Sequence, residues 1–228
     1  MADPAPSGPE APDPATEALR HGYDRVAEPY AARFFDELAH KPLDRALLAC
    51  FAEQVQGLGP VADVGCGPGQ VASWLHERGL PVLGVDLSPK MVALARRRSP
   101  GLDFREGTML ALDAGDAAWG GIVAFYSIIH LPPADRPRAL RELHRVLRPG
   151  GLLLLAFHVG DQRLHVDEFL GQPVSIDFYL LDPAALERGL EQAGFTVEAR
   201  VERRPYTTVE AQTRRCYLLA RKPEPGSG

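Results

Sequence analysis

The stretch 61-VADVGCGPGQ-70, followed by 82-VLGVDLSPKM-91, determines the fold class of this chain. An apolar strand that runs into three alternate glycines, and then into a helix, leaves bare backbone where a ligand must come close. The second apolar strand ends in Asp86, 21 residues after Gly65. A βαβ unit uses about this spacing to set a carboxylate against the hydroxyls of a ribose. The pattern therefore predicts a site for a nucleoside cofactor.

The glycine loop also indicates which nucleoside binds. A pyrophosphate-binding loop has the pattern GxGxxG, and Gln70 stands where that pattern has its last glycine. Asp63 would repel a phosphate dianion at short range, whereas it would attract an ammonium group. A cofactor with an amino-acid end, a sulfonium and an adenosine fits both acids, with Asp63 near the amine and Asp86 on the ribose.

Five stretches in this order resemble the class I S-adenosylmethionine-dependent methyltransferases, in the small-molecule branch of that superfamily. They are DVGCGPG (63–69), GVDLSPKMVALAR (84–96), FREGTMLAL (104–112), AFYSIIHL (124–131) and LRELHRVLRPGGLLLLAF (140–157). The resemblance implies that S-adenosyl-L-methionine is the cofactor. It also implies an α/β fold with a doubly wound, Rossmann-like sheet, mostly parallel with one antiparallel terminal strand, and a helical N-terminal lid.

The apolar runs predict strands that alternate with helices. This alternation requires a parallel sheet covered on both faces. Ser88 is expected to cap the helix that begins at Pro89. The predicted strands are 60–64, 81–86, 102–106, 121–127, 151–157, 195–203 and 216–221, and the predicted helices are 70–78, 134–147, 183–193 and the one from Pro89.

We expect a single domain over residues 16–222, with proline-rich residues 1–15 and residues 223–228 as disordered tails. Residues 16–57 show helical spacing, which Pro29 and Pro42 are expected to break, and the resemblance places them over the cofactor mouth.

The segment 158–182 does not fit the strand and helix alternation. Alternate apolar residues at Val174, Ile176 and Phe178 predict a strand, as half of a hairpin. Because loops at the carboxyl ends of parallel strands carry binding sites, this segment is a candidate substrate cover, with a dimer contact or a decoration of the fold as the alternative.

Composition limits the partners. The net charge of −5 gives no diffuse basic field, so we expect no binding to bulk nucleic acid. The three cysteines are far apart and show no metal-ligand spacing, which predicts no metal and a reduced, cytoplasmic protein. The apolar stretches are far shorter than the roughly 20 residues that span a bilayer, so no membrane partner is expected. A monomer or a homodimer is expected.

The resemblance and the loop together predict the cofactor-binding residues. The glycines are expected to act through backbone geometry, with Cys66 as a small residue in the same loop, and an adenine-binding acid common in the family is replaced by Thr108. Tyr23 and Tyr30 are expected to offer hydroxyls to the cofactor carboxylate or ring faces to the sulfonium. The predicted residues are Tyr23, Tyr30, Asp63, Gly65, Cys66, Gly67, Gly69, Asp86, Leu87, Met91, Thr108, Met109, Leu110 and Phe125.

The candidate catalytic residues are His130 and Tyr126, at the carboxyl side of the fourth predicted strand. An imidazole titrates near neutrality, so His130 is a candidate general base, with a packed structural histidine as the alternative. The Asn/Asp-Pro-Pro-aromatic turn of the family's adenine and amide N-methylating enzymes is absent here. We therefore expect methylation of a small metabolite, with oxygen slightly favoured over nitrogen.

Three other functions stay open at this point. Asp63 and Gln70 argue against a nicotinamide-dependent oxidoreductase. A cofactor-binding regulatory or scaffold protein without catalysis is a second alternative. A methyltransferase that acts on a macromolecule, such as tRNA or a peptide, is the third.

Overall fold

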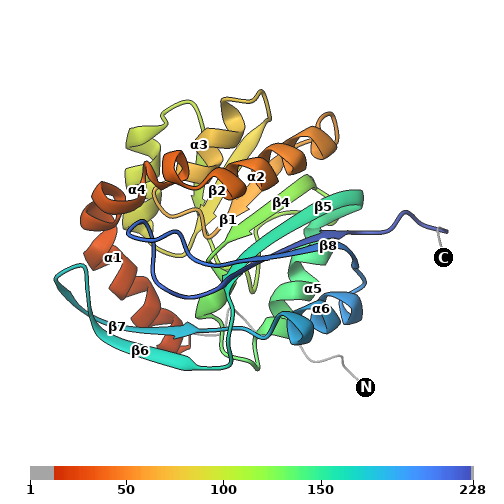
Figure 1. Cartoon of the computed structure of the whole chain (residues 1–228). Helices are drawn as coiled ribbons and strands as arrows, with labels where there is room; N and C mark the ends of the chain where they lie inside the picture. Colours follow the sequence, from red (N-terminus) through yellow and green to blue (C-terminus); the bar gives the residue numbers. More distant parts are fainter. Residues whose placement is uncertain (1–12, 227–228) are drawn as a thin grey trace, which may run out of the picture.

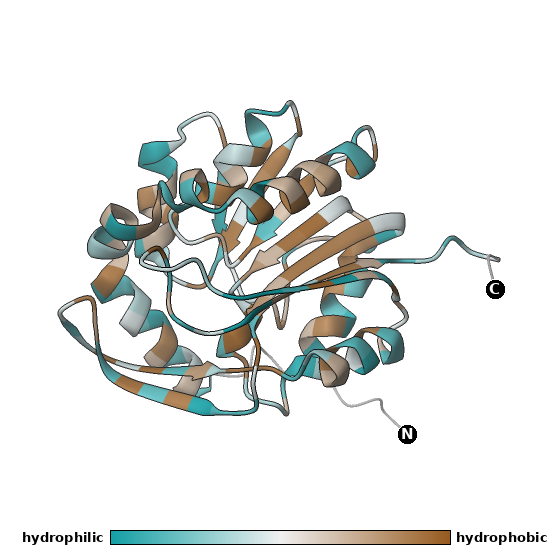
Figure 2. Ribbon diagram, in the orientation of Figure 1, coloured by the Kyte–Doolittle hydropathy of each residue, from teal (hydrophilic) through white to brown (hydrophobic). Residues whose placement is uncertain are grey.

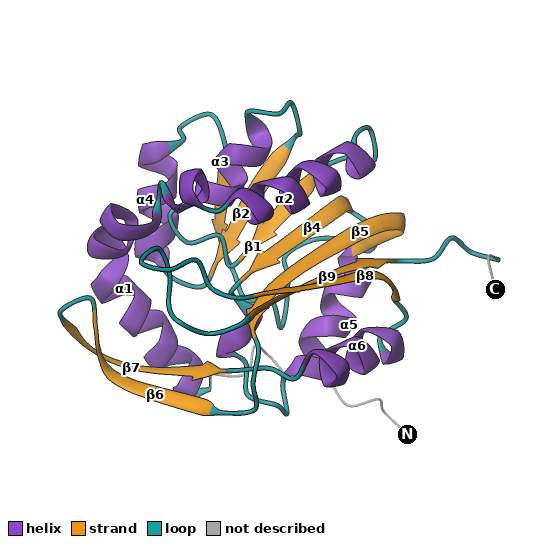
Figure 3. Cartoon of the chain, in the orientation of Figure 1, coloured by secondary structure: helices purple, strands orange, loops and turns teal. Residues whose placement is uncertain are grey.

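The computed structural model describes residues 13–226, and most of the predicted N-terminal tail and residues 227–228 lie outside the described residues. A seven-stranded sheet with the order β3-β2-β1-β4-β5-β9-β8 forms the centre of the molecule (Figures 1 and 3). Its strands are β1 (Val61–Val64), β2 (Val82–Asp86), β3 (Asp103–Glu106), β4 (Trp119–Phe125), β5 (Leu147–His158), β8 (Thr196–Arg203) and β9 (Arg215–Arg221).

The strand directions confirm the predicted fold class. Strands β1 to β5 pair in parallel, and β9 lies antiparallel between β5 and β8. Each observed strand overlaps its predicted range. The largest difference is in β5, which begins at Leu147 rather than at Gly151. A shift in the pairing register with β4 and the positive φ of Gly150 (76°) allow the strand to include these earlier residues.

Helices cover both faces of the sheet. One face packs against α2, α3 and α4, and the other packs against α5 and α6. Figure 2 shows apolar residues along the central strands that lie between these layers. The bounds are α1 (Pro14–Phe34), α2 (Pro42–Val55), α3 (Gln70–His76), α4 (Pro89–Arg98), α5 (Arg136–Val146), α6 (Pro183–Gln192), and the 3₁₀ turns η1 (Glu37–His40) and η2 (Ile128–His130).

The helix α4 begins as predicted. The side chain of Ser88 accepts a hydrogen bond from the Met91 amide at 3.1 Å, and Pro89 is the first helical residue. Among residues 13–226, no helix has both the length and the apolar composition that crossing a membrane requires.

The prediction that Pro29 ends a helix is wrong. Helix α1 continues through Pro29 to Phe34, and only Pro42 begins a new helix, α2. An interior proline costs a helix about 3 kcal/mol, so other contacts must stabilise α1. Its buried Val26, Ala27 and Ala31 supply them by packing against α4 and the segment that follows β5. Helix α1 also begins at Pro14, two residues before the predicted boundary of the lid.

The segment after β5 forms the predicted hairpin. Strands β6 (Arg163–Phe169) and β7 (Gln172–Tyr179) pair in antiparallel fashion outside the main sheet. Figure 1 shows this hairpin running alongside α1. A Cβ atom at Gly22 of α1 would lie 2.7 Å from Ile176, so the glycine permits the close approach of helix and strand.

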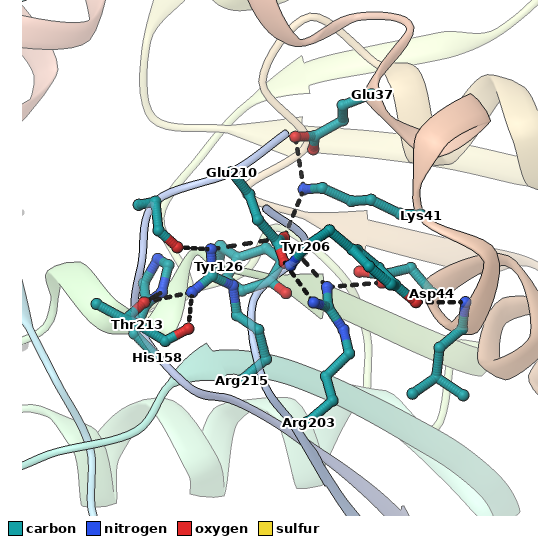
Figure 4. A network of polar contacts seen from close by, with 12 residues as sticks. Glu37, Lys41, Asp44, Tyr126, His158, Arg203, Tyr206, Glu210, Thr213 and Arg215 are labelled. Atoms are coloured by element: carbon teal, nitrogen blue, oxygen red, sulfur yellow. Dashed lines mark hydrogen bonds and ion pairs between the residues drawn. The ribbon is translucent and has the colours of Figure 1, made fainter. Parts of the chain in front are cut away.

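A buried ion-pair network joins α2 to the last two strands (Figure 4). We define it as Lys41, Asp44, Arg203, Glu210 and Arg215, whose side chains are at most 8% exposed. Asp44 accepts hydrogen bonds from Arg203 and from the Tyr217 hydroxyl, each at 2.9 Å. When Glu37, which pairs with Lys41, is included, the cluster holds three cations and three acids. Its net charge is then near zero, which limits the free-energy cost of burying it.

Removal of Asp44 should destabilise the fold. The change Asp44→Ala leaves the Arg203 guanidinium with Glu210 alone and deprives the Tyr217 hydroxyl of its acceptor, so we expect a loss of about 3 kcal/mol. Denaturant unfolding measures it. The matched control is Asp116→Ala, which removes an ion pair with Arg145. The Asp116 side chain is 80% exposed. The control should cost about 1 kcal/mol or less. Equal losses in the two variants would contradict this account of the network.

Candidate active site

The glycine loop follows β1 and turns back on itself through left-handed backbone conformations. Gly65, Gly67 and Gly69 have φ values of +77°, +53° and +87°. At Gly65 the space is also closed, because a Cβ atom would lie 2.2 Å from the Cβ of Ser127. The structure thus requires glycine at position 65 for both conformation and space, and the space is occupied by Ser127.

Asp86 ends β2 and faces the same loop. One carboxylate oxygen accepts a hydrogen bond from the Gly67 amide at 2.7 Å, and the other accepts from the Ser88 amide at 2.8 Å. Burial raises the pKa of Asp86 to about 6, although these two hydrogen bonds lower it. Each carboxylate oxygen keeps a second lone pair, so the fixed carboxylate can still accept hydrogen bonds from two hydroxyls.

A cavity lies over the carboxyl ends of β1, β2 and β4. Helix α1 contributes Leu19, Arg20, Tyr23 and Tyr30 to its lining. The structure brings most of the predicted site residues together in its lining, namely Tyr23, Tyr30, Gly65, Gly67, Asp86, Leu87, Met91, Thr108, Met109, Phe125, Tyr126 and His130.

A smaller neighbouring cavity is lined by Asp63, the other acid in the predicted cofactor site. Asp63 and Cys66 line it together with Glu37 of η1 and Gln70 of α3. Two predicted residues line neither cavity. Gly69 packs near Phe104 at the start of α3, and Leu110 packs against the core on the face covered by α5.

The smaller cavity presents mainly hydrogen-bond acceptors. Asp63 accepts the Ala72 amide at 3.0 Å, and burial raises its pKa to about 7. The Oε1 atom of Gln70 is buried and has no hydrogen-bond partner among the described residues. Glu37 also lines this cavity, and its carboxylate is paired with Lys41 at 2.7 Å. Asp63, Gln70 and Glu37 together fit a ligand that brings several N–H donors and a positive charge, and they disfavour a phosphate.

Sequence reasoning missed Glu37 and the acceptor role of Gln70. Glu37 belongs to no local motif, and it reaches the loop only because η1 folds over it. Gln70 was interpreted only as a departure from the pyrophosphate-binding pattern. Leu19, Arg20 and Ser127 also line the larger cavity without having been predicted.

The adenine side of the larger cavity is mainly apolar. Leu87, Met91 and Met109 lie in its lining beside Thr108. The Thr108 hydroxyl accepts the Leu110 amide at 3.2 Å, so it stabilises its own turn. Burial raises the pKa of the Cys66 thiol well above its usual value, which keeps the thiol neutral.

His130 does not have a free nitrogen. Its Nδ1 lies 3.0 Å from the Asp177 carbonyl oxygen, which can only accept, so Nδ1 carries the hydrogen. Its Nε2 lies 2.7 Å from the Tyr23 hydroxyl and therefore accepts from it. Burial lowers the pKa of His130 to about 4, so the ring is neutral near pH 7. A direct contact between a ring nitrogen and a substrate would require one of these bonds to break.

Tyr126 is the other candidate catalytic residue, and its hydroxyl is hydrogen-bonded to Tyr217. Tyr126 follows β4 with φ +55°, a conformation rare for a bulky residue. Its hydroxyl donates to that of Tyr217 at 3.1 Å, because Tyr217 donates in turn to Asp44. The Tyr126 ring lines the cavity, while its hydroxyl connects to the buried ion-pair network (Figure 4).

The chain is similar to known methyltransferases in sequence and in fold. The family described as a methyltransferase domain matches residues 61–151. The methyltransferase GfsG of Streptomyces halstedii is 43% identical over 103 residues, covering 42% of this chain and 36% of that protein. The demethylmenaquinone methyltransferase of Thermus thermophilus is 35% identical over 167 residues, covering 60% of this chain and 74% of that protein.

A solved structure extends the similarity to the whole fold. The DhpI complex with SAH superposes with a TM-score of 0.70 at 20% identity, covering 92% of this chain and 98% of that one. The chain belongs to the class I S-adenosylmethionine-dependent methyltransferases. It spans less than two thirds of the length of several curated relatives, from 36% to 57%.

The geometry of the loop gives a test of its role. Gly65→Ala should abolish the binding of S-adenosyl-L-methionine, measured by calorimetry, since the new methyl group would displace Ser127 and the loop. The matched control is Gly79→Ala, where φ is also positive (+82°) but no atom lies within 4 Å of the added Cβ. The control should lose some stability and keep its affinity. Unchanged affinity in Gly65→Ala would show that the loop does not hold the cofactor.

Proposed function

We propose that this chain transfers the methyl group of S-adenosyl-L-methionine to a small-molecule acceptor, with an oxygen acceptor slightly favoured over a nitrogen. The observation that carries the proposal is the acceptor-rich cavity beside the glycine loop. Asp63, Glu37 and Gln70 converge there, and a nucleotide with a pyrophosphate would meet two carboxylates.

Each part of the cofactor has a matching group in the site. Asp86 would accept the ribose hydroxyls, and Leu87, Met91 and Met109 would pack on the adenine. The ammonium would lie among Asp63, Glu37 and Gln70. Tyr23 and Tyr30 line the cavity between these ends and can attract the sulfonium, which is worth about 0.5–2 kcal/mol.

The residues of the chain mainly align the reactants and exclude water. S-adenosyl-L-methionine supplies a methyl carbon that is already activated by a positively charged sulfur. The lid and the glycine loop fix the cavity around it, and orientation of this kind can supply roughly 7–11 kcal/mol of a reaction barrier. The site therefore needs little covalent chemistry from its own side chains.

The position of helix α1 supports a small acceptor. Helix α1 contributes four residues to the lining of the cavity and the hairpin packs beside α1, so both restrict the approach of a bulky macromolecule to the methyl group. The relatives named for demethylmenaquinone and for malonyl-[acyl-carrier protein] show that related domains differ widely in acceptor. The acceptor preference here rests on His130, Tyr23 and the absent amine-binding turn.

Calorimetry with S-adenosyl-L-methionine and with NADH tests the cofactor assignment. We expect binding of the first and none of the second. Turnover to S-adenosylhomocysteine against a panel of phenols, carboxylic acids, alcohols and amines then separates an enzyme from a cofactor-binding scaffold. Binding of NADH, or of neither ligand, would contradict the proposed function.

The affinity for S-adenosyl-L-methionine should depend on pH through Asp63. Its pKa is raised to about 7, so the carboxyl becomes neutral as the pH falls below 7 and then attracts an ammonium less. We expect the Kd to be at least about tenfold higher at pH 5.5 than at pH 7.5. The ligand amine is still largely protonated at pH 7.5, so it carries its positive charge at both values. Calorimetry at both values measures this difference.

Two controls isolate Asp63 from Asp86. 5′-Methylthioadenosine lacks the amino-acid end, so its affinity should change less with pH. Asp63→Asn should weaken binding of S-adenosyl-L-methionine at pH 7.5 and flatten its pH dependence. If the variant keeps the pH dependence of the natural chain, another group binds the amine.

A further inference from the structure

Three groups from distant parts of the chain form one line of hydrogen bonds at the edge of the larger cavity. Tyr23 of α1 donates to Nε2 of His130 at 2.7 Å, and Nδ1 of His130 donates to the Asp177 carbonyl of β7 at 3.0 Å. The Tyr23 and His130 rings meet edge to face, with centroids 5.1 Å apart. The Phe178 ring packs on His130 at 4.9 Å, so the imidazole is held on several sides.

Only Tyr23 in this line offers an unoccupied polar atom to the cavity. Both nitrogens of His130 are already bonded, which leaves only ring carbons to face a ligand. The Tyr23 oxygen gives its hydrogen to His130 but keeps acceptor capacity, so it can receive a hydrogen bond from an acceptor hydroxyl. Tyr23 and His130 both line the cavity.

The nearby charged groups have partners of their own. The Asp177 carboxylate accepts from Arg163 at 2.7 Å and is bonded to His165 at 2.9 Å, so only its backbone carbonyl serves His130. Arg20, which also lines the cavity, pairs with Glu17. His158 of β5 lies on the same side and is itself bonded to Thr213. Within residues 13–226, neither Tyr23 nor His130 hydrogen-bonds a carboxylate.

We propose that Tyr23 is the catalytic residue that takes the proton of the methyl acceptor, and that His130 takes the proton of Tyr23 in the same step. The Asp177 carbonyl of the hairpin is a positioning group, because it keeps the hydrogen of His130 on Nδ1 and so leaves Nε2 free to receive. This inference rests on the proposed function and names the proton path of that site.

The step balances in atoms and charge. The acceptor oxygen forms a bond to the methyl carbon as the carbon–sulfur bond breaks, and the electron pair of the broken bond stays on sulfur. The acceptor proton moves to the Tyr23 oxygen, and the Tyr23 proton moves to Nε2 of His130. The positive charge lost by the sulfonium is thus found on the imidazolium, which later returns its proton to solvent.

The arrangement gives the hairpin a chemical role. A substrate cover that only excluded water would have no need to bond the imidazole. Here the carbonyl of β7 selects the tautomer in which His130 can act through Tyr23, so the hairpin must be docked before the proton path is complete. The candidate cover of the sequence prediction thereby becomes a part of the site.

Nuclear magnetic resonance of the full chain labelled with ¹⁵N-histidine tests the arrangement without any acceptor. Two-bond proton–nitrogen spectra should show a neutral His130 with its hydrogen on Nδ1 between pH 5.5 and 8, assigned with His130→Asn. Tyr23→Phe should shift the Nε2 resonance, because it removes the donor. Tyr179→Phe is the matched control, since its hydroxyl has no hydrogen bond among the described residues, and it should leave His130 unchanged. A hydrogen on Nε2, or a charged ring, would overturn the proposal.

Kinetics with an acceptor from the panel tests the proton transfer itself. Tyr23→Phe should lower kcat at least tenfold, with the Kd for S-adenosyl-L-methionine within threefold of that of the natural chain, because acid–base groups contribute roughly 10²–10⁴-fold. His130→Gln should lower kcat similarly, since an amide can accept the hydrogen bond of Tyr23 but cannot take its proton. Full activity in His130→Gln would show that His130 is only structural.

The outcomes separate this inference from the proposed function. If the chain binds and turns over S-adenosyl-L-methionine but Tyr23→Phe keeps its kcat within threefold, the proton path is wrong and the function stands. If the natural chain binds no S-adenosyl-L-methionine, the proposed function fails. The resonance test stands in either case, because it reports the tautomer directly.

Discussion

The double hydrogen bond of Asp86 is the interaction on which the site depends. Its carboxylate holds the amide of Gly67 and the amide of Ser88, so one side chain ties the glycine loop after β1 to the start of α4. The loop can be this tight only because Gly65 leaves room for Ser127 at the end of β4. The floor of the cavity is therefore set by three neighbouring strands at once.

Charge is distributed unevenly around this floor. The smaller cavity holds hydrogen-bond acceptors, among them Asp63, whose own burial raises its pKa. Keeping a buried carboxylate charged is favourable only when a cation enters the site. By contrast, the buried ion-pair network contains its own cations and is close to neutral. The two lie near each other around Tyr126, which lines the cavities with its ring and joins the network through its hydroxyl. The network and the smaller cavity share Glu37, which pairs with Lys41 at 2.7 Å and also lines the cavity.

The elements outside the sheet complete the chemistry. Helix α1 supplies Tyr23, η1 supplies Glu37, and the hairpin supplies the carbonyl that orients His130. Helix α1 and the hairpin pack against each other and against α4 through a small apolar cluster of their own, whereas Leu38 of η1 packs in a cluster that flanks the sheet. That cluster of α1, α4 and the hairpin is separate from the two clusters that flank the sheet.

The sequence by itself determined the sheet, the glycine loop, the carboxylate at Asp86 and the cap at Ser88, because each depends on residues that are near neighbours in the chain. Only the tertiary structure decided that α1 continues through Pro29, that Glu37 reaches the loop and that Tyr23 hydrogen-bonds His130. Tyr23 and His130 are 107 residues apart, and His130 and Asp177 are 47 apart. No local pattern encodes such contacts, since they arise from the packing of a helix and a hairpin onto an already formed sheet.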